Sequence, residues 1–270
     1  MSSIKLGLKR LTPRPLWRAG RQVLLMAKHA LLWPSAYLHP VRRSSIARLG
    51  QMQGIHKGKR AFIIGNGPSL RATDVSKLKG EFTFGMNRVY LAFPNWGFQT
   101  SYFVSVNDLV IEQSAQEIEA LSMPKFLAWR ARRYVAPRPD ILFLHSTYER
   151  PAFSRDARRR LWEGATVTYV ALQLAFHMGF ETVILIGVDH SFSTTGQPNT
   201  TVTSQGDDPD HFAADYFGRG FRWQLPDLDM SERAYAMARG AYEADGRQVL
   251  DATIGGKLQV FPKVDYNSLF

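Results

Sequence analysis

A histidine and a tyrosine five residues apart, His211 and Tyr216, are the side chains of this sequence best suited to acid–base chemistry. They follow a long polar stretch and lie in the run H-F-A-A-D-Y. Histidine titrates near neutral pH and commonly takes a proton from a hydroxyl, while tyrosine can hydrogen-bond a departing phosphate without adding charge. We therefore expect His211 to act as a general base with Tyr216 at the leaving group. His190, next to Asp189, is the main competing base.

A glycine-rich loop, Gly65-Asn66-Gly67-Pro68-Ser69, directly follows an apolar run. Glycine allows a tight turn and lets a ligand approach backbone N–H groups, and the side chains of Asn66 and Ser69 can hydrogen-bond a phosphate or a sugar. The loop has neither the lysine of a Walker loop nor the spacing of a dinucleotide-binding fingerprint, and ordinary turns use the same residues. The pattern predicts a binding loop, with a plain turn as the alternative.

Polar side chains recur where other apolar segments end. Asn87 and Asn107 each follow a predicted strand, and beside the first loop they predict a neutral hydrogen-bonding rim for a ribose, a base or a sugar. Thr166 and Thr168 begin a predicted helix, whose positive end can meet an anion. Helix capping is the alternative for all four. Asp189 follows the clearest buried strand and either accepts from loop N–H groups or contacts ligand.

The elements that must position these residues follow from hydrophobic patterning. Apolar runs predict strands at residues 59–64, 82–86, 101–106, 125–129, 141–144, 182–186 and 248–252. Helical spacing predicts helices at residues 73–78, 108–121, 165–178 and 230–245, and residues 191–210 form a long polar loop. Strands that alternate with helices indicate an α/β fold with a mostly parallel sheet covered by helices, and ligands bind such sheets at the carboxyl ends of the strands.

Composition narrows the class of protein. The chain has 270 residues, of which 45% are hydrophobic and 21% charged, as in a globular protein of one large domain or one domain with an arm. It has no cysteine, which excludes disulfides, thiolate nucleophiles and cysteine-ligated metals. The acidic residues Asp207, Asp208 and Asp210 are typical of a solvated turn. We expect no metal or other cofactor to be required.

The positive charge is concentrated at the N-terminus. Residues 1–60 hold thirteen of the 34 basic residues and none of the 23 acidic ones, so the rest of the chain is nearly neutral. The apolar stretches between these charges are shorter than the roughly 20 residues of a membrane-spanning helix, but a basic helix with Trp and Leu can lie in a membrane interface.

We therefore expect a basic amphipathic arm over residues 1–57 and a catalytic nucleotide-binding domain over residues 58–270. Residues 1–50 should bind an anionic membrane surface, which cosedimentation of the full chain with anionic vesicles tests. The alternatives are a helix packed on the domain and a contact with nucleic acid. A nucleic-acid partner is not expected, because the neutral body offers no matching basic face or motif.

The chain resembles two related groups of proteins in the runs I-I-G-N-G-P-S-L (63–70), M-N (86–87), V-N-D (106–108), G-A-T-V-T (164–168), A-F-H-M-G-F-E-T-V-I-L-I-G-V-D (175–189) and H-F-A-A-D-Y (211–216). One group is the metal-independent bacterial sialyltransferases that use CMP-sialic acid. The other is a broad uncharacterised family similar to archaeal hydroxymethyldihydropterin pyrophosphokinases. Both have a Rossmann-like core, so the resemblance implies that fold for roughly residues 58–265.

Roles at matching positions follow from this resemblance. It implies phosphate contacts by Asn66 and Ser69, contacts to ribose, base or sugar by Asn87 and Asn107, binding near cytosine or phosphate by Thr166 and Thr168, and assistance to the leaving phosphate by Tyr216. The sialyltransferases carry their catalytic histidine three residues after that tyrosine, where this chain has Arg219. The position that faces the sugar ring is Ser191 here instead of tyrosine. The base is therefore His211, as in the uncharacterised family, and sialic acid is not the expected donor.

Together, these features favour an inverting, metal-independent glycosyltransferase. The favoured donor is a CMP-activated acidic sugar, and the acceptor is a glycan or glycolipid. A pterin-type pyrophosphokinase that uses Asp189 with Asp207 or Asp208 at Mg²⁺, and a non-catalytic nucleotide-binding module, remain as alternatives. The expected location is the cytoplasm, peripheral on the inner face of the cell membrane.

Overall fold

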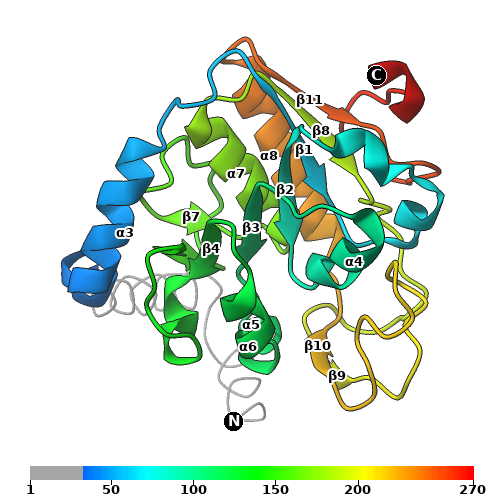
Figure 1. The fold of residues 1–270 in the computed structure, drawn as a ribbon, viewed down its shortest axis with the longest axis horizontal. Helices are drawn as coiled ribbons and strands as arrows, with labels where there is room; N and C mark the ends of the chain where they lie inside the picture. Colours follow the sequence, from blue (N-terminus) through cyan, green and yellow to red (C-terminus); the bar gives the residue numbers. More distant parts are fainter. Residues whose placement is uncertain (1–32) are drawn as a thin grey trace, which may run out of the picture. The chain divides into compact units, whose positions relative to one another are not determined.

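A seven-stranded sheet organises residues 33–270, the part of the chain that the computed structural model describes (Figure 1). Its strand order is β11-β8-β1-β2-β3-β4-β5, and all neighbouring strands run parallel. The strands are β1 (Arg60–Ile64), β2 (Phe82–Met86), β3 (Tyr102–Ser105), β4 (Lys125–Ala128), β5 (Ile141–Leu144), β8 (Thr182–Ile186) and β11 (Gln248–Asp251). The predicted α/β fold and its Rossmann-like sheet are confirmed.

Helices cover the sheet, as its nearly continuous apolar strands require. The two long helices, α7 (Val167–Met178) and α8 (Leu228–Glu243), pack side by side against it (Figure 1). Gly179 ends α7 in the left-handed region with a φ of 92°. The other helices are α3 (Pro40–Gln51), α4 (Phe93–Trp96), α5 (Asp108–Gln113) and α6 (Ala115–Ala120), with 3-10 turns η1 (Pro68–Ala72), η2 (Val75–Leu78), η3 (Val89–Ala92), η4 (Trp129–Arg133) and η5 (Tyr266–Leu269).

Several elements differ from the sequence prediction. The helix expected over residues 108–121 is broken into α5 and α6 at Ser114, whose backbone leaves the helical region. The segment predicted as a helix at residues 73–78 forms the 3-10 turn η2, which Asp74 caps by accepting from the amide of Ser76. The long loop contains β9 (Thr201–Thr203), which pairs antiparallel with β10 (Arg222–Gln224). A small parallel pair, β6 (Ser146–Thr147) and β7 (Leu161–Trp162), was also not predicted.

The predicted N-terminal arm falls mostly outside the described residues. Membrane docking by residues 1–50 and the peripheral location therefore stay predictions. The compact α/β body comprises residues 44–270, so residues 44–51 of α3 belong to it. There His177 donates from Nε2 to the carbonyl of Leu49 at 2.7 Å. Among residues 33–270, no helix is both long and apolar enough to cross a bilayer.

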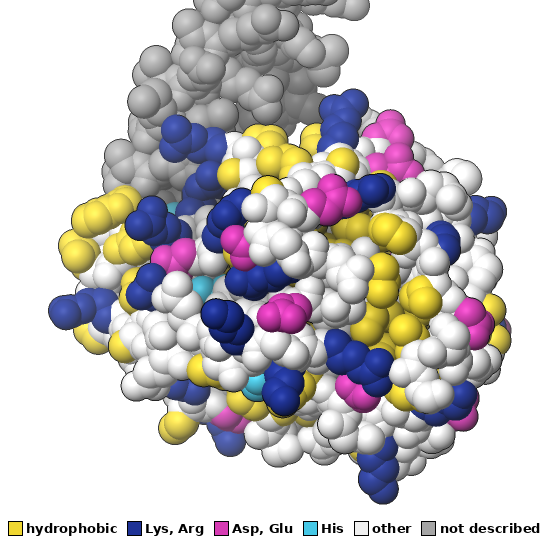
Figure 2. Space-filling view, turned by 90° about the horizontal axis from the view of Figure 1, so that it is seen from above, with side chains coloured by type: hydrophobic (Ala, Val, Ile, Leu, Met, Phe, Trp, Pro, Cys, Tyr) yellow, Lys and Arg dark blue, Asp and Glu magenta, His cyan; other side chains and the backbone are white. Residues whose placement is uncertain are grey.

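Charged side chains of both signs are interspersed on the face of the body seen in Figure 2. Within the body, Arg60 and Glu81 form an ion pair of 2.6 Å. This mixture agrees with the nearly neutral composition of the chain beyond residue 60.

The order of the strands creates a switch point between β1 and β8. The chain builds β1 to β5 outward on one side and then returns to place β8 on the other side of β1. The loops that follow β1 and β8 therefore lie next to each other at the carboxyl ends of their strands. In open parallel sheets, this crevice is where ligands bind.

Glycines let these two loops approach each other closely. A Cβ added to Gly65 would overlap the carbonyl oxygen of Gly187, and one added to Gly67 would overlap the carboxylate of Asp189. Neither Gly65 nor Gly67 has a positive φ. The loop therefore needs its glycines for contact with the β8 loop, and their part in the approach of a ligand stays a prediction.

We predict that Gly67→Ala lowers the free energy of unfolding by about 1–3 kcal/mol, because the new methyl group must displace the Asp189 carboxylate from a packed contact. Thermal unfolding followed by circular dichroism measures the change. Gly240→Ala, in α8 with open space around its Cα, is the control and should leave the stability unchanged or raise it by up to about 1 kcal/mol. A Gly67→Ala protein as stable as the parent would contradict this account of the loop.

Candidate active site

The glycine-rich loop directs its hydrogen-bond donors toward the β8 loop. The amide of Gly67 donates to the carbonyl of Gly187 at 2.9 Å. The amide and hydroxyl of Ser69 donate to the two carboxylate oxygens of Asp189, at 3.0 and 2.7 Å. Pro68, at the start of η1, has no N–H to offer. Asp189 thus takes the structural role that was one of its two expected roles, and Ser69 and Pro68 do not line the pocket described next.

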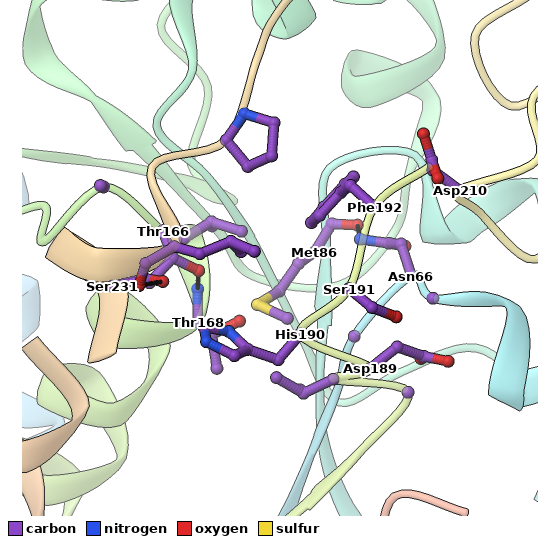
Figure 3. Close-up of a pocket in the computed structure, with 18 of the residues that line it drawn as sticks. Asn66, Met86, Thr166, Thr168, Asp189, His190, Ser191, Phe192, Asp210 and Ser231 are labelled. Carbon is purple, nitrogen blue, oxygen red and sulfur yellow. Dashed lines mark hydrogen bonds between the residues drawn. The ribbon is translucent and has the colours of Figure 1, made fainter. Parts of the chain in front are cut away.

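A pocket of about 160 Å³, here called the first pocket, opens at the switch point. Figure 3 shows its two sides, with Asn66 and Asp189 on one and Thr166, Thr168 and Ser231 on the other. The predicted site residues that line it are Gly65, Asn66, Gly67, Thr166, Thr168, Asp189, Ser191 and His211. The fold therefore brings most of the predicted site residues together in one pocket.

Asn66 lines this pocket and holds a buried acceptor that lacks a partner in the described chain. Its Nδ2 donates to the carbonyl of Met86 at 3.1 Å, which fixes the orientation of the amide. Its Oδ1 is buried and has no hydrogen-bond partner among residues 33–270. An unsatisfied buried acceptor costs about 1–3 kcal/mol, so a ligand that brings an N–H or O–H donor here gains binding energy.

The amino end of α7 forms the opposite wall. Gly164 and Ala165 both adopt left-handed backbone, with φ of 59° and 61°, and turn the chain into the helix. Thr166 caps the helix by accepting from the amide of Thr168 at 3.3 Å, so the capping alternative applies to it. Thr166 and Thr168 also line the first pocket. The helix dipole and these hydroxyls can therefore meet an anion there.

Backbone strain is concentrated around the site. Five residues other than glycine in the described chain have a positive φ: Asn87 (52°), Arg150 (61°), Ala165 (61°), His190 (55°) and Asn199 (64°). All but Arg150 line the first pocket or the second pocket described below. Such conformations cost about 1–3 kcal/mol each and are characteristic of functional sites.

His211 is oriented by a carboxylate. Its Nδ1 lies 2.8 Å from Oδ2 of Asp208, and the side chains of His211 and Asp208 are 12% and 7% exposed. Because a carboxylate oxygen only accepts, Nδ1 is the protonated nitrogen, and Nε2 keeps the lone pair of the neutral ring. This is the arrangement of a general base with a positioning partner.

The role of Asp208 was missed because its acidic neighbourhood suggested a solvated turn. Asp208 and Asp210 are in fact buried, whereas Asp207 is exposed. The D-P-D-H run, with carboxylate and imidazole three residues apart in a turn, is the signal in the sequence that could have indicated the pair.

Tyr216 lies beneath His211 instead of in the pocket. The two rings stack with centroids 4.0 Å apart and planes 5° apart. The hydroxyl of Tyr216 is buried, accepts from the amide of Arg88 at 3.3 Å and lines neither pocket. Burial raises the pKa of this hydroxyl. The geometry thus brings Tyr216 to His211, but with the ring as a support for the imidazole.

The segment that carries His211 is tied to the glycine-rich loop. The amide of Phe212 donates to the carbonyl of Asn66 at 2.9 Å. The guanidinium of Arg71 donates to the carbonyls of His211 and Phe212, at 2.8 and 2.9 Å. The general-base candidate is therefore positioned by the same loop that lines the first pocket, although 140 residues separate Arg71 from His211 in the chain.

Asp210 ties the opposite end of the long loop to this segment. Its carboxylate accepts from the amide and hydroxyl of both Ser193 and Thr194, at 2.6–3.3 Å. Burial acts to raise the pKa of Asp210, but these hydrogen bonds hold it below its ordinary value. The carboxylate therefore clamps the start of the loop near Ser191, which lines the first pocket.

A second pocket of about 190 Å³ adjoins the first. Asn87 and Asn107 line this second pocket and not the first, so the predicted amide rim is divided between the two. Oδ1 of Asn107 caps α5 by accepting from the amides of Leu109 and Val110. Residues shared by both pockets include Ala165, Thr166, Val167, Phe192, His211 and Pro226. His211 thus stands where the pockets meet.

The competing base, His190, also lines the first pocket, but its Nε2 lies 3.1 Å from a carboxylate oxygen of the exposed Glu232. Within residues 33–270, no three carboxylate or histidine side chains are grouped closely enough to hold a metal ion.

Comparisons with known proteins extend these observations. Residues 41–195 match the sequence model of the family described as 6-hydroxymethylpterin diphosphokinase MptE-like, which confirms the predicted resemblance to that group. Among solved structures, the MAf glycosyltransferase from Magnetospirillum magneticum AMB-1 is similar, with a TM-score of 0.51 and 16% sequence identity. The match covers 92% of this chain but 43% of that structure, so the chain spans less than half of its length. No curated protein matches the chain.

We predict that the neutral His211 ring carries its proton on Nδ1, because Asp208 accepts from that atom. Two-bond ¹H–¹⁵N NMR correlations of the histidine rings report the tautomer directly. In Asp208→Asn the new amide can donate to Nδ1, so the proton should move to Nε2. Asp207→Asn, at the exposed neighbouring position, is the matched control and should keep the parent tautomer. A ring protonated on Nε2 in the parent protein would contradict the proposed pairing.

Proposed function

Because the chain belongs to the family of 6-hydroxymethylpterin diphosphokinase MptE-like proteins, we propose that it acts on a nucleotide-activated substrate, as an inverting glycosyltransferase. The observation that carries the proposal is the position of His211, with Nδ1 held by Asp208, at the junction of two pockets. A transfer between two substrates needs such a junction, with a base between the donor and the acceptor. The glycosyltransferase of similar fold supports the proposal by analogy only.

The first pocket supports a donor with little negative charge. Among its lining residues in the described chain there is no Lys or Arg. Its groups for an anion are the amino end of α7 and the hydroxyls of Thr166 and Thr168. A CMP-sugar carries one phosphate with a single negative charge, which neutral donors and a helix end can stabilise. We therefore favour a CMP-activated sugar as donor, with the acceptor of Asn66 meeting a donor group of the nucleotide.

In the proposed reaction, Nε2 of His211 takes the proton of an acceptor hydroxyl. The hydroxyl oxygen forms a bond to the anomeric carbon of the donor sugar, while the bond from that carbon to the phosphate oxygen breaks. The electron pair of the broken bond leaves on CMP, whose phosphate is stabilised at the start of α7. A single displacement inverts the anomeric carbon. The ring of Tyr216 supports the imidazole that becomes protonated.

The name of the family favours a second candidate, transfer of diphosphate from ATP to a pterin. That chemistry normally uses Mg²⁺ held by acidic side chains. The carboxylates at the site already have partners, since Asp189 accepts from Ser69 and Asp208 from His211. Binding without turnover would instead indicate a nucleotide-binding module.

We predict that CMP raises the melting temperature of the protein without added metal. A ligand at a hundred times its Kd stabilises the native state by about 2.7 kcal/mol, which shifts the Tm of a domain of this size by about 5–11 °C. A thermal-shift series with CMP, UDP, GDP and ATP, each with and without Mg²⁺, measures the effect. Stabilisation by ATP with Mg²⁺ and a pterin, but not by CMP, would favour the diphosphokinase over the proposal.

We predict that His211→Ala lowers turnover by about 10²–10⁴-fold, the usual contribution of a positioned base, with the CMP thermal shift nearly unchanged. Release of CMP from a CMP-sugar in the presence of acceptor is the assay. His190→Ala is the matched control, because His190 lines the same pocket. A collapse of turnover in His190→Ala, with His211→Ala near normal, would transfer the role of base to His190.

A further inference from the structure

The second pocket is lined by aromatic rings and carboxamides. The aromatic residues are Tyr148, Phe192, Phe217 and Trp223, and the carboxamides are Asn87, Asn107, Asn199 and Gln224. A pyranose ring has apolar C–H faces that pack on aromatic rings and hydroxyls that both donate and accept. A carboxamide also donates and accepts, so it can pair with such a hydroxyl.

Trp223 is the best placed of these rings to stack on a ligand. It lies on β10 and packs on Phe217, with centroids 5.3 Å and planes 26° apart. Phe217 belongs to a buried cluster with Val110 and Tyr216, the residue that supports His211. The indole is therefore held on a packed base, and its ring centroid lies 6.4 Å from that of His211.

The strand that carries Trp223 is fixed to the body. The side chain of Gln113 on α5 donates to the carbonyl of Arg222 at 2.8 Å and accepts from its amide at 2.9 Å. The guanidinium of Arg222 also pairs with Glu112 at 2.9 Å. The backbone and the side chain of Arg222, the first residue of β10, are thus both bonded to α5. The wall of the pocket is therefore preformed.

The charges around the pocket are already paired. Glu163 is buried and lines the pocket, but its carboxyl is bonded by the guanidinium of Arg130. The same guanidinium pairs with Asp108 at 2.8 Å and donates to the hydroxyl of Tyr148 at 2.8 Å. Among the described residues that line this pocket there is no Lys or Arg. An acidic ligand would meet no free cation here and would lie near the Glu163 carboxyl.

We propose that the second pocket binds the neutral sugar ring of the acceptor, stacked on Trp223 and presenting its hydroxyl to Nε2 of His211. This inference rests on the proposed function, and it adds the chemical class of the acceptor. The charged donor then occupies the first pocket. The second pocket shares the start of α7 with it, but it selects against uronic acids and phosphorylated sugars because no Lys or Arg of the described chain lines it and the Glu163 carboxyl lies in its wall.

Ligand-observed NMR on the full chain tests the proposal without a donor. Methyl β-D-glucopyranoside and methyl β-D-galactopyranoside are the neutral probes, and methyl β-D-glucuronide is the acidic probe. We expect at least one neutral glycoside to bind and the glucuronide to bind more weakly. Trp223→Ala should weaken binding of the neutral glycoside by about 10-fold, as expected for loss of an aromatic stacking partner, and Trp223→Phe should restore most of it.

Trp96→Ala is the matched control, since Trp96 lies on α4 and lines neither pocket. Gln224→Ala, which removes an amide without disturbing the aromatic stack, should also weaken binding. The CMP thermal shift of each variant shows that it is folded and reads the donor site separately. Preferential binding of the glucuronide, or unchanged binding in Trp223→Ala and Gln224→Ala, would overturn the acceptor class even where CMP still binds. If CMP does not raise the melting temperature of the parent protein, that result would instead count against the proposed function.

Discussion

The close approach of the loops after β1 and β8 is the contact on which the site depends. Gly65 and Gly67 leave no room for a side chain against Gly187 and Asp189. The carboxylate of Asp189 then accepts both donors of Ser69, so the two loops form one rigid unit at the switch point of the sheet. A side chain at either glycine would separate the loops and open the floor of the first pocket.

This unit also positions the groups proposed to carry the chemistry. The carbonyl of Asn66 holds the amide of Phe212, and Arg71 at the end of η1 holds the carbonyls beside it. The glycine-rich loop and Arg71 therefore hold the backbone at His211, while Asp208 and Tyr216 hold its ring. The positive end of α7 faces it across the first pocket, and the aromatic wall on β10 lies in the second. Donor, base and acceptor thus share one rigid junction.

Much of this arrangement follows from the sequence. The seven strands of the main sheet were predicted to within one residue at each end, because largely apolar runs bounded by polar residues have few other solutions. The strands β9 and β10 were missed because they are short and partly exposed, so their pairing depends on contacts with α5 that no local pattern encodes.

Among the site residues, too, some are indicated by local sequence patterns and others depend on tertiary contacts. Motif positions such as Asn66, Thr166 and His211 gather at the first pocket. Asp208 is only three residues from His211, so the sequence could have indicated it, whereas Arg71 is 140 residues away and requires the folded chain. The structure also reassigns hydrogen-bond donors. Ser69 donates to Asp189, and the hydroxyl oxygen of Tyr216 accepts from the amide of Arg88, because buried polar groups pair with the partners that the fold brings close.

The central claim is that the loops after β1 and β8 and the start of α7 together bind a nucleotide. Hydrogen–deuterium exchange of the full chain with saturating CMP tests it most directly. The account predicts slower exchange at residues 65–69, 166–170 and 187–192, with the amino ends of the strands unchanged. Absence of protection in these three segments, or protection confined to another part of the chain, would contradict it.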